Sequence, residues 1–513
     1  SNTLVLTAGA SNRFYVDPNT HLGTLTAGTN NLALGVNAGN SIASGGNYNT
    51  VVGDEAGTAL TTGDNNVALG YNSLASEDTG SANTAIGRYA LSALNNDAVS
   101  YNTAVGFSAG AAITTGVQNT FIGGLAGDAN TTASNNTAVG SSALTANTTG
   151  TANTAIGMQS LKANTTASSN TAIGLNALLV NTTGADNTAV GSVSLDANTT
   201  GASNTAVGQN ALTQNTTASN NTGVGKSVLS ANTTGANNVA LGYQALFSNT
   251  DISNLTAVGY GAAFANTSGA SITAIGYRSL IANTSGSSNT ALGRDTLAAN
   301  TTGSNNTAIG SDSLEANTTG AGNTAIGAVA LTANTTGANN TGIGYGALDA
   351  NTTGASNTAL GAFTLSATTT GSSLTALGTL ALSANTSGSS NVAVGYGSGT
   401  TLTTGDANTF VGTVAGEDLT TGNRNTAVGS GAGANATTPD DLTALGYFAG
   451  GTAVMTGHDN TAIGTVALTN TTSGEANTAV GRSSLTTNTT GSNNTAVGLN
   501  SLLANTTGTS NVA

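Results

Sequence analysis

A five-residue motif, Asn-Thr-Ala-Val/Ile-Gly, recurs every 17 residues along most of this chain. Its glycines keep that interval without a break from Gly106 to Gly446, and the series extends outward to Gly35 and Gly498, which gives 28 copies. A short fixed period is typical of a stack of one structural unit in which each copy contacts its neighbours. We therefore predict one elongated array over residues 31–513, preceded by an irregular N-terminal segment over residues 1–30.

Three intervals in the series are longer than the others. The intervals that end at Gly53, Gly106 and Gly464 contain one, two and one additional residues, which we expect to form small protruding loops. The chain begins with Ser1 and stops at Ala513, two residues before the next motif glycine would fall. We expect a segment of a longer protein that contains 28 full repeats and the start of another.

The repeat length and composition favour an all-β fold. Seventeen residues are too few for a strand and a helix but suit one coil of a β-solenoid, and Asn, Thr and Gly are poor helix formers. Tryptophan and cysteine are absent and aromatic residues make up 4%, so a large core of bulky side chains cannot form. We predict a parallel β-solenoid or β-roll, with coils stacked about 4.8 Å apart into a rod on the order of 130 Å long.

The copy at residues 204–220 illustrates the two faces of the predicted strand. Because side chains alternate along a strand, Thr205 and Val207 face one side, while Asn204, Ala206 and Gly208 face the other. The Val position is aliphatic in every copy, so we predict that the Thr/Val side faces a core.

The Asn side of the strand also carries a packing signal. Four copies replace the Asn with an aliphatic residue: Leu255, Ile272, Leu374 and Leu442. The position is therefore predicted to be packed, and a buried Asn there needs hydrogen-bond partners, which a ladder of amides along the stack would provide. One face would close the coil of its own chain, and the other would meet another chain.

A second predicted strand contains Ala211 and Leu212. Eight coils have Gly at the Leu position, and five of these have an aliphatic residue three positions later: Ile42, Leu60, Ile113, Leu402 and Leu419. We infer that both positions point into one interior and that the backbone path is shifted between the two kinds of coil. One Leu and one Val or Ile per coil is little apolar burial, so we expect contacts between chains, with a homotrimer preferred.

The repeats resemble those of a known class of fibre proteins. The stretches from Asn204 to Leu212 and from Asn323 to Leu331, each followed by an Asn-Thr-Thr turn, are similar to repeats of bacteriophage tail fibres, those of cyanophages and marine phages in particular. They resemble the head repeats of trimeric autotransporter adhesins less closely. The segment Phe14–Pro18 is similar to one that precedes such repeats in phage and giant-virus fibre proteins. The resemblance implies a trimeric fibre on a virion.

The sequence gives little support for catalysis or for a cofactor. His21 and His458 are far apart in the series of repeats, no cysteine is present, and both histidines are expected to be surface loop residues instead of general bases. Acidic pairs such as Asp54-Glu55 lack the Gly- and Asp-rich spacing of calcium-binding β-rolls. We predict a protein that is not an enzyme and that holds neither a cofactor nor a metal.

Nucleic acid and membrane are also unfavourable partners. Eight Lys and Arg residues against 22 Asp and Glu, a net charge of −14, leave no basic surface for phosphate groups. The longest apolar runs, such as residues 177–180, are much shorter than a membrane span. We predict neither nucleic-acid binding nor membrane insertion.

Two surface arrays have alternative interpretations. Tyr243, Tyr260 and Tyr277 follow the motif glycine in three successive coils; a column of these rings is either a glycan platform or, as we prefer, simple stacking on a turn. Thr pairs such as Thr216 and Thr217 would form ladders, as in ice-binding solenoids. Neighbouring residues point to opposite sides of a strand, however, which argues against one flat Thr face.

These observations together predict the shaft of a phage tail fibre, a rigid trimeric spacer for attachment to the host surface. Its partners would be copies of itself and other virion tail proteins, in an extracellular location. A host glycan or receptor would be bound by a tip outside this segment. A bacterial surface adhesin or filament is an alternative, and an ice-binding solenoid is another.

Overall fold

The computed structural model describes residues 6–7, 13–16, 22–23 and 27–513. In the first 30 residues it contains β1 (Leu6–Thr7), β2 (Arg13–Val16) and β3 (Leu22–Gly23), which form an antiparallel sheet. His21 and the end of the segment Phe14–Pro18 lie outside the described residues.

Every other regular element of the described part is a three-residue strand, and the predicted all-β parallel solenoid is confirmed. The chain forms two compact units, residues 1–254 and 255–513. The strands of the first unit that follow β3 are β4 (Leu32–Leu34), β5 (Thr50–Val52), β6 (Val67–Leu69), β7 (Thr84–Ile86), β8 (Thr103–Val105), β9 (Thr120–Ile122), β10 (Thr137–Val139), β11 (Thr154–Ile156), β12 (Thr171–Ile173), β13 (Thr188–Val190), β14 (Thr205–Val207), β15 (Thr222–Val224) and β16 (Val239–Leu241).

The second unit has the same construction. Its strands are β17 (Thr256–Val258), β18 (Thr273–Ile275), β19 (Thr290–Leu292), β20 (Thr307–Ile309), β21 (Thr324–Ile326), β22 (Thr341–Ile343), β23 (Thr358–Leu360), β24 (Thr375–Leu377), β25 (Val392–Val394), β26 (Thr409–Val411), β27 (Thr426–Val428), β28 (Thr443–Leu445), β29 (Thr461–Ile463), β30 (Thr478–Val480) and β31 (Thr495–Val497).

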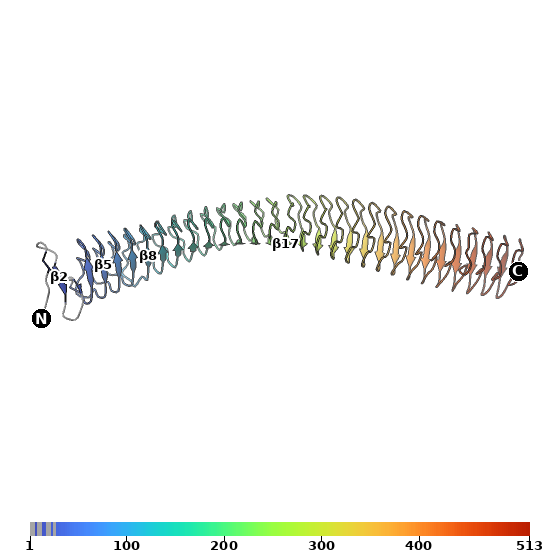
Figure 1. Cartoon of the computed structure of the whole chain (residues 1–513), viewed down its shortest axis with the longest axis horizontal. Coiled ribbons are helices and arrows are strands. Elements are labelled where there is room, and N and C mark those ends of the chain that lie inside the picture. The colour runs from blue at the N-terminus through green and yellow to red at the C-terminus, as the bar shows by residue number, and fades with distance from the viewer. Residues whose placement is uncertain (1–5, 8–12, 17–21, 24–26) are drawn as a thin grey trace. The chain divides into compact units, whose positions relative to one another are not determined.

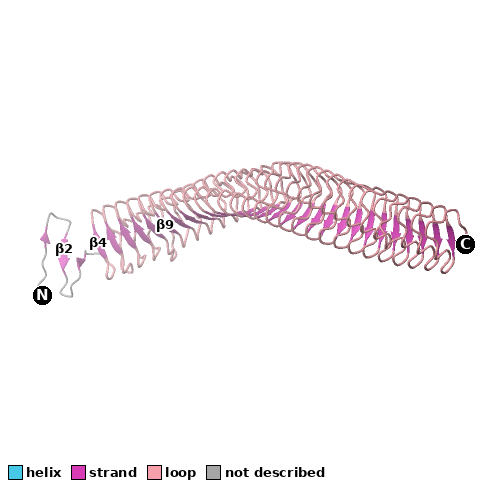
Figure 2. Ribbon diagram, turned by 45° about the vertical axis from the view of Figure 1, so that its right-hand side comes forward, coloured by secondary structure: helices cyan, strands magenta, loops and turns pink. Residues whose placement is uncertain are grey.

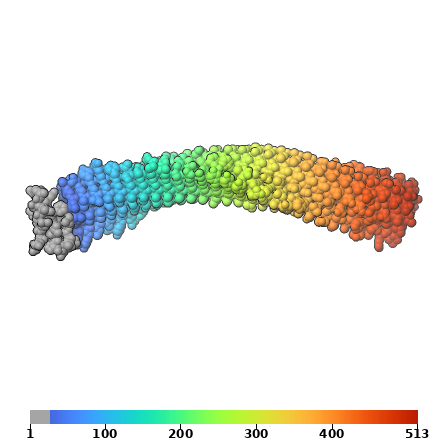
Figure 3. Space-filling model, viewed as in Figure 1, coloured from blue at the N-terminus to red at the C-terminus, as the bar shows by residue number. Residues whose placement is uncertain are grey.

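From β4 onward, the strands within each unit pair in parallel and in register. Thr188 of β13 lies opposite Thr205 of β14, and Val190 lies opposite Val207. In each unit the strands line one side of the stack, and turns form the remainder of every coil (Figures 1 and 2). The space-filling view shows successive coils of a unit lying against one another (Figure 3). Each coil is therefore supported mainly by the coil before it and the coil after it.

The structure reverses the predicted orientation of the strand: the side that carries Asn and Ala faces the interior, and the side that carries Thr and Val faces outward. Ala206 and Asn204 are fully buried, whereas Thr205 and Val207 are only half-buried. The expectation that the Thr/Val side faces the core of the coil is wrong, because the short coil encloses a narrow interior that accepts Ala at the strand. The expectation that the Asn side is packed is confirmed, since Leu255 and Leu374 are each 1% exposed. The expectation that this side meets another chain is wrong, because these residues are buried within the coils of their own chain.

Ala211 and Leu212 lie in a turn, so the predicted second strand is wrong. Both residues are fully buried, and Leu212 points inward from a left-handed backbone conformation with φ of +53°. Such a conformation costs a non-glycine residue about 1–2 kcal/mol, which the burial of its side chain offsets. It also explains why Gly is accepted at this position in eight coils.

The exchange between Leu and Gly coils conserves interior volume. A Cβ atom on Gly39 would lie 2.8 Å from Cδ1 of Ile42, so both positions point into one interior, as predicted. The predicted shift of backbone path is wrong, because Gly110 has φ of +59°, close to the +53° of Leu212. Phe121 and Phe410 replace the strand Ala in two coils. Gly110 and Gly127 leave room for the ring of Phe121, and Gly399 and Gly416 do the same for Phe410.

The additional residues of the three long intervals lie in exposed turns. Residues 44 and 45 are exposed, as are residues 97–99 and Val454. Each of these exposed segments precedes the next strand.

The motif glycine is required by the stacking itself. Gly208 has φ of +137°, and a Cβ atom there would lie 2.4 Å from the carbonyl oxygen of Gly225 in the next coil. Gly208 therefore allows two coils to approach at a point where any other residue would be strained and would clash.

We predict that Gly208→Ala lowers the free energy of unfolding by at least about 1–3 kcal/mol, because the backbone strain is joined by a steric clash. Gly124→Ala is the matched control, since Gly124 has no left-handed φ and nothing lies within 4 Å of the position that an added Cβ atom would take. Its effect should stay within about 0.5 kcal/mol in denaturant unfolding. Equal losses for the two variants would contradict the stacking role of Gly208.

Candidate functional site

The buried Asn residues of the motif form the predicted ladder. Asn204 Oδ1 accepts the backbone N–H of Asn221 at 3.0 Å, while Nδ2 donates to the carbonyl of Ala218 at 2.9 Å and to Asn187 Oδ1 at 3.1 Å. The amide thus links three successive coils. Its hydrogen bonds satisfy a polar group that has no access to water.

A second Asn ladder was not predicted. Asn215 Nδ2 donates to Asn198 Oδ1 at 2.9 Å and to the carbonyl of Ala218 at 3.1 Å, and both Asn side chains are fully buried. The signal was present in the sequence, because Ile42 and Leu60 stand at this same position in the Gly coils. The first ladder was predicted from copies in which an aliphatic residue replaces Asn, and the same comparison at this position would have predicted the second ladder.

The second ladder is interrupted where its Asn is replaced. Thr368 and Leu402 follow Asn351 and Asn385 in the column, and neither can supply an amide donor. The Oδ1 atoms of Asn351 and Asn385 are accordingly buried without a hydrogen-bond partner. The ladders are structural elements of the interior and are not accessible to a ligand.

The threonines form two chemically different arrays. In the turn, Thr216 Oγ1 donates to the carbonyl of Thr233 at 3.1 Å, and neighbouring coils repeat this bond. In the strand, the Thr205 hydroxyl makes no hydrogen bond within the chain, and the same holds for the other strand threonines of β4–β31. The turn threonines stabilise the stack, whereas the strand threonines have hydroxyls available for a partner.

We define the strand face of each unit as the outward side chains of its parallel strands, β4–β16 in the first unit and β17–β31 in the second, in the columns equivalent to Thr205 and Val207. Twenty-four of these 28 strands begin with Thr, and none contains a charged residue, so the strand face of each unit is regular and neutral. Its aliphatic residues are partly exposed, to 44% at Leu292 and 48% at Leu360. An apolar surface of this extent is typical of an interaction site.

The tyrosine column does not form an open platform. The rings of Tyr260 and Tyr277 are 5.2 Å apart and inclined by 20°, so they cover one another's faces. The two residues are about half exposed, at 48% and 49%. Sugar binding by stacking uses an open ring face, and this pair therefore favours simple stacking on a turn. Tyr243, the third predicted member, is 41% exposed and belongs to the first unit.

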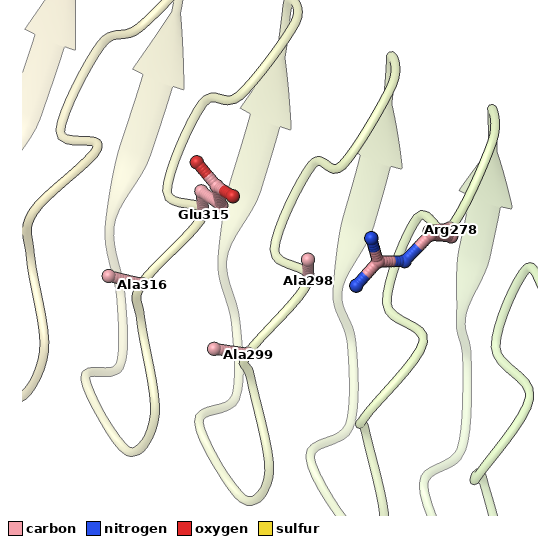
Figure 4. A pocket seen from close by; sticks show the side chains of 5 residues that line it. All are labelled: Arg278, Ala298, Ala299, Glu315 and Ala316. Atoms are coloured by element: carbon pink, nitrogen blue, oxygen red, sulfur yellow. The ribbon is translucent and has the colours of Figure 1, made fainter.

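A shallow groove of about 270 Å³ is lined by Arg278, which follows Tyr277 in the chain, and by residues of the next two coils (Figure 4). Ala298 and Ala299 lie on the middle coil of three, with Arg278 on the coil before it and Glu315 and Ala316 on the coil after it. Arg278 Nε already lies 3.5 Å from Asp295 Oδ1. The groove exists because three of its lining residues are alanines with small side chains. Its lining contains no pair of nucleophile and general base.

The described residues contain no cluster of three or more metal-ligating side chains. His458 Nδ1 accepts the backbone N–H of Asp440 at 2.9 Å, which gives this histidine a structural role in a turn. Arg424 and Asp441 form a bidentate pair at 2.8 Å, and this pairing lowers the pKa of the Asp441 carboxyl. The strand face is thus the candidate that remains.

We predict that Asn204→Asp costs about 3–5 kcal/mol at neutral pH, because it places an unpaired charge in the interior. Asn204→Leu copies the natural replacement Leu374 and should cost about 1–3 kcal/mol for the lost hydrogen bonds. Denaturant unfolding at pH 7 and pH 4 measures both, and the Asp penalty should shrink at pH 4 as the carboxyl takes up a proton. Equal and pH-independent costs would show that the ladder does not depend on the amide.

No helix in the described residues has the length and apolar character to span a membrane. Comparison with known proteins adds no relative to this picture, because neither a family model nor a curated protein sequence matches the chain.

Proposed function

We propose that this chain forms a non-enzymatic fibre shaft, a rigid spacer of the kind found in phage tail fibres, and that three copies associate through their strand faces. The observation that carries the proposal is the strand face, a neutral and partly apolar surface repeated in every coil. The bonds between coils support the rigidity, and the periodicity of the strand face supports the association.

Rigidity follows from the number of bonds between neighbouring coils. The coil that contains Asn204 is joined to the next by strand pairing, by the two Asn ladders and by the Thr216 hydroxyl. Bending the stack requires several of these bonds to lengthen together. Length is then set by the number of coils, which is the property that a spacer needs.

Association follows from the periodicity of the strand face. A partner that contacts every Thr and every Val or Leu must repeat at the same spacing, about 4.8 Å along the stack. A second copy of the chain meets this condition. Three parallel copies around one axis would bring identical columns together in a closed ring, which leaves no strand face exposed.

The proposed location is a virion tail, outside the cell. Other tail proteins would hold one end of the shaft, and a tip beyond this segment would bind a host glycan or receptor. A bacterial surface filament would use the same shaft, so an electron micrograph of the source particle, with the chain labelled by antibody, distinguishes the two. Label along virion tail fibres supports the proposal, and label on bacterial cells contradicts it.

We predict that the chain in solution has three times the monomer mass of 49.1 kDa by light scattering. Replacement of Val190, Val207 and Val224 by Lys should yield monomers, because it places three charges on the strand face. The matched control places the same three lysines in an exposed turn, at Thr200, Thr217 and Thr234. This control should leave the trimer intact. A monomeric wild type would overturn the proposed association.

One observation favours a second candidate function, ice binding. The strand hydroxyls are free and are arranged in register on a regular sheet, a geometry that suits an ordered water lattice. The turn threonines are unsuitable for binding ice, because hydroxyls such as that of Thr216 already donate a hydrogen bond to a backbone carbonyl, here that of Thr233. We expect no thermal hysteresis in the freezing of a solution of the protein, because the strand face is covered by other copies. Clear hysteresis would instead support ice binding.

A further inference from the structure

The tyrosines of the second unit occupy one position of the repeat. All five stand two residues after the end of a strand, and each is about half exposed: Tyr260, Tyr277, Tyr345, Tyr396 and Tyr447. Arg294 and Arg482 occupy this position in two further coils, and no acidic residue does so in this unit. We call this column the tyrosine edge. Tyr and Arg are the residues that most often anchor protein interfaces.

The other end of each strand carries small side chains. We define the small-residue edge as the residues two positions before β18–β31. The residue there is exposed in all 14 coils and is Ser, Asn, Ala or Gly in 11 of them, the exceptions being Arg424, Asp441 and Asp459. The strand face lies between the two edges, because each coil runs from the small-residue edge through the outward Thr and Val to the tyrosine edge.

The two edges also differ in charge. Each count below covers an edge and the adjoining residue of each coil that lies farther from the strand. Around the tyrosine edge there are three cations and two acids, a net charge of +1: Arg278, Arg294, Arg482, Asp295 and Asp312. Around the small-residue edge there are one cation and five acids, a net charge of −4 with His458 neutral: Arg424, Asp406, Asp440, Asp441, Asp459 and Glu475. Surfaces of opposite charge attract each other at an interface.

We propose that the tyrosine edge of one copy packs against the small-residue edge of the next copy, which sets the copies parallel. This inference rests on the proposed association through the strand faces. Copies related by rotation about the long axis of the stack bring unlike edges together. An antiparallel pair of strand faces would instead set tyrosines against tyrosines and acids against acids.

Parallel copies in register place identical coils at the same height, so the fit can be followed within one coil. Tyr396 shares its coil with Ser390, an exposed small residue that leaves room for a ring from the next copy. Arg482 shares its coil with Glu475, which has the opposite charge. Bulk therefore meets a small side chain, and a cation meets an acid.

Several rings of the tyrosine edge are already held by aromatic neighbours. The Tyr345 ring lies 5.2 Å from that of Phe363, and the Tyr447 ring lies 4.7 Å from that of Phe448, both edge to face. Such contacts restrict the rotation of the tyrosine side chains. Side chains that are ordered in advance lose less entropy when a partner covers them.

Cross-linking of the full chain tests the proposal, because the chain contains no cysteine. The variant with Tyr396→Cys and Ser390→Cys is treated with a short bismaleimide and separated on a denaturing gel. The two positions lie on the order of 20 Å apart along the extended backbone of one chain, so a short linker joins them only between copies. We expect covalent trimers from the double variant and none from either single variant. Co-expression of the two single variants should give covalent dimers.

Ser387→Cys in place of Ser390→Cys is the matched control, because Ser387 is exposed in the turn of the same coil but lies outside the small-residue edge. It should give no covalent trimer with Tyr396→Cys. Pairing Tyr396→Cys with Ser373→Cys or Ala407→Cys tests a register shifted by one coil, and a cross-link there still supports the pairing of the two edges.

Light scattering of the same variants separates the two ways in which the proposal can fail. Trimers in which Tyr396→Cys cross-links to none of the three small-residue positions overturn the edge pairing alone, and leave the tyrosine edge open to another ligand such as a glycan. Cross-links in the single variant Tyr396→Cys overturn it as well, because like edges then meet. A monomeric chain overturns the proposed association and this inference together.

Discussion

The parallel pairing of each coil with the next, residue by residue, is the constraint on which the remainder of this structure depends. Because Thr188 lies opposite Thr205 and Val190 opposite Val207, every position of the repeat becomes a column along the stack. A column of Asn can then bond to itself, and a column of Gly can bring backbones together. Within each unit the same pairing converts one Thr and one aliphatic residue per coil into a regular outer surface.

The narrow interior decides which residues each column accepts. Ala206 fits at the strand and Leu212 fills the space from the opposite turn, at the cost of a left-handed backbone. Where Phe121 enlarges the strand position, Gly110 and Gly127 provide the volume. Glu77 is an exception among these interior residues, a fully buried carboxylic acid whose two oxygens accept the backbone N–H groups of Gly80 and Asn96.

Much of this could be predicted from the sequence, because a fixed period and its exceptions carry the information. The solenoid, the packed Asn and the exchange between Leu212 and Gly all followed from comparing copies of the repeat. The inward face could not be predicted, because a column of aliphatic residues such as Val207 is expected both on a half-buried outer face and in a core. The left-handed Leu and the free strand hydroxyls depend on backbone angles and hydrogen bonds that no residue pattern specifies.

The strand face connects this architecture to a role as a shaft, because a surface that repeats with every coil suits a partner with the same repeat. The central claim is that coils stack directly, at one strand spacing each, instead of winding around other chains. X-ray fibre diffraction from aligned protein measures this spacing. A sharp reflection along the fibre axis at about 4.7–4.8 Å is the predicted result, and its absence, or a longer axial repeat per coil, would contradict the account.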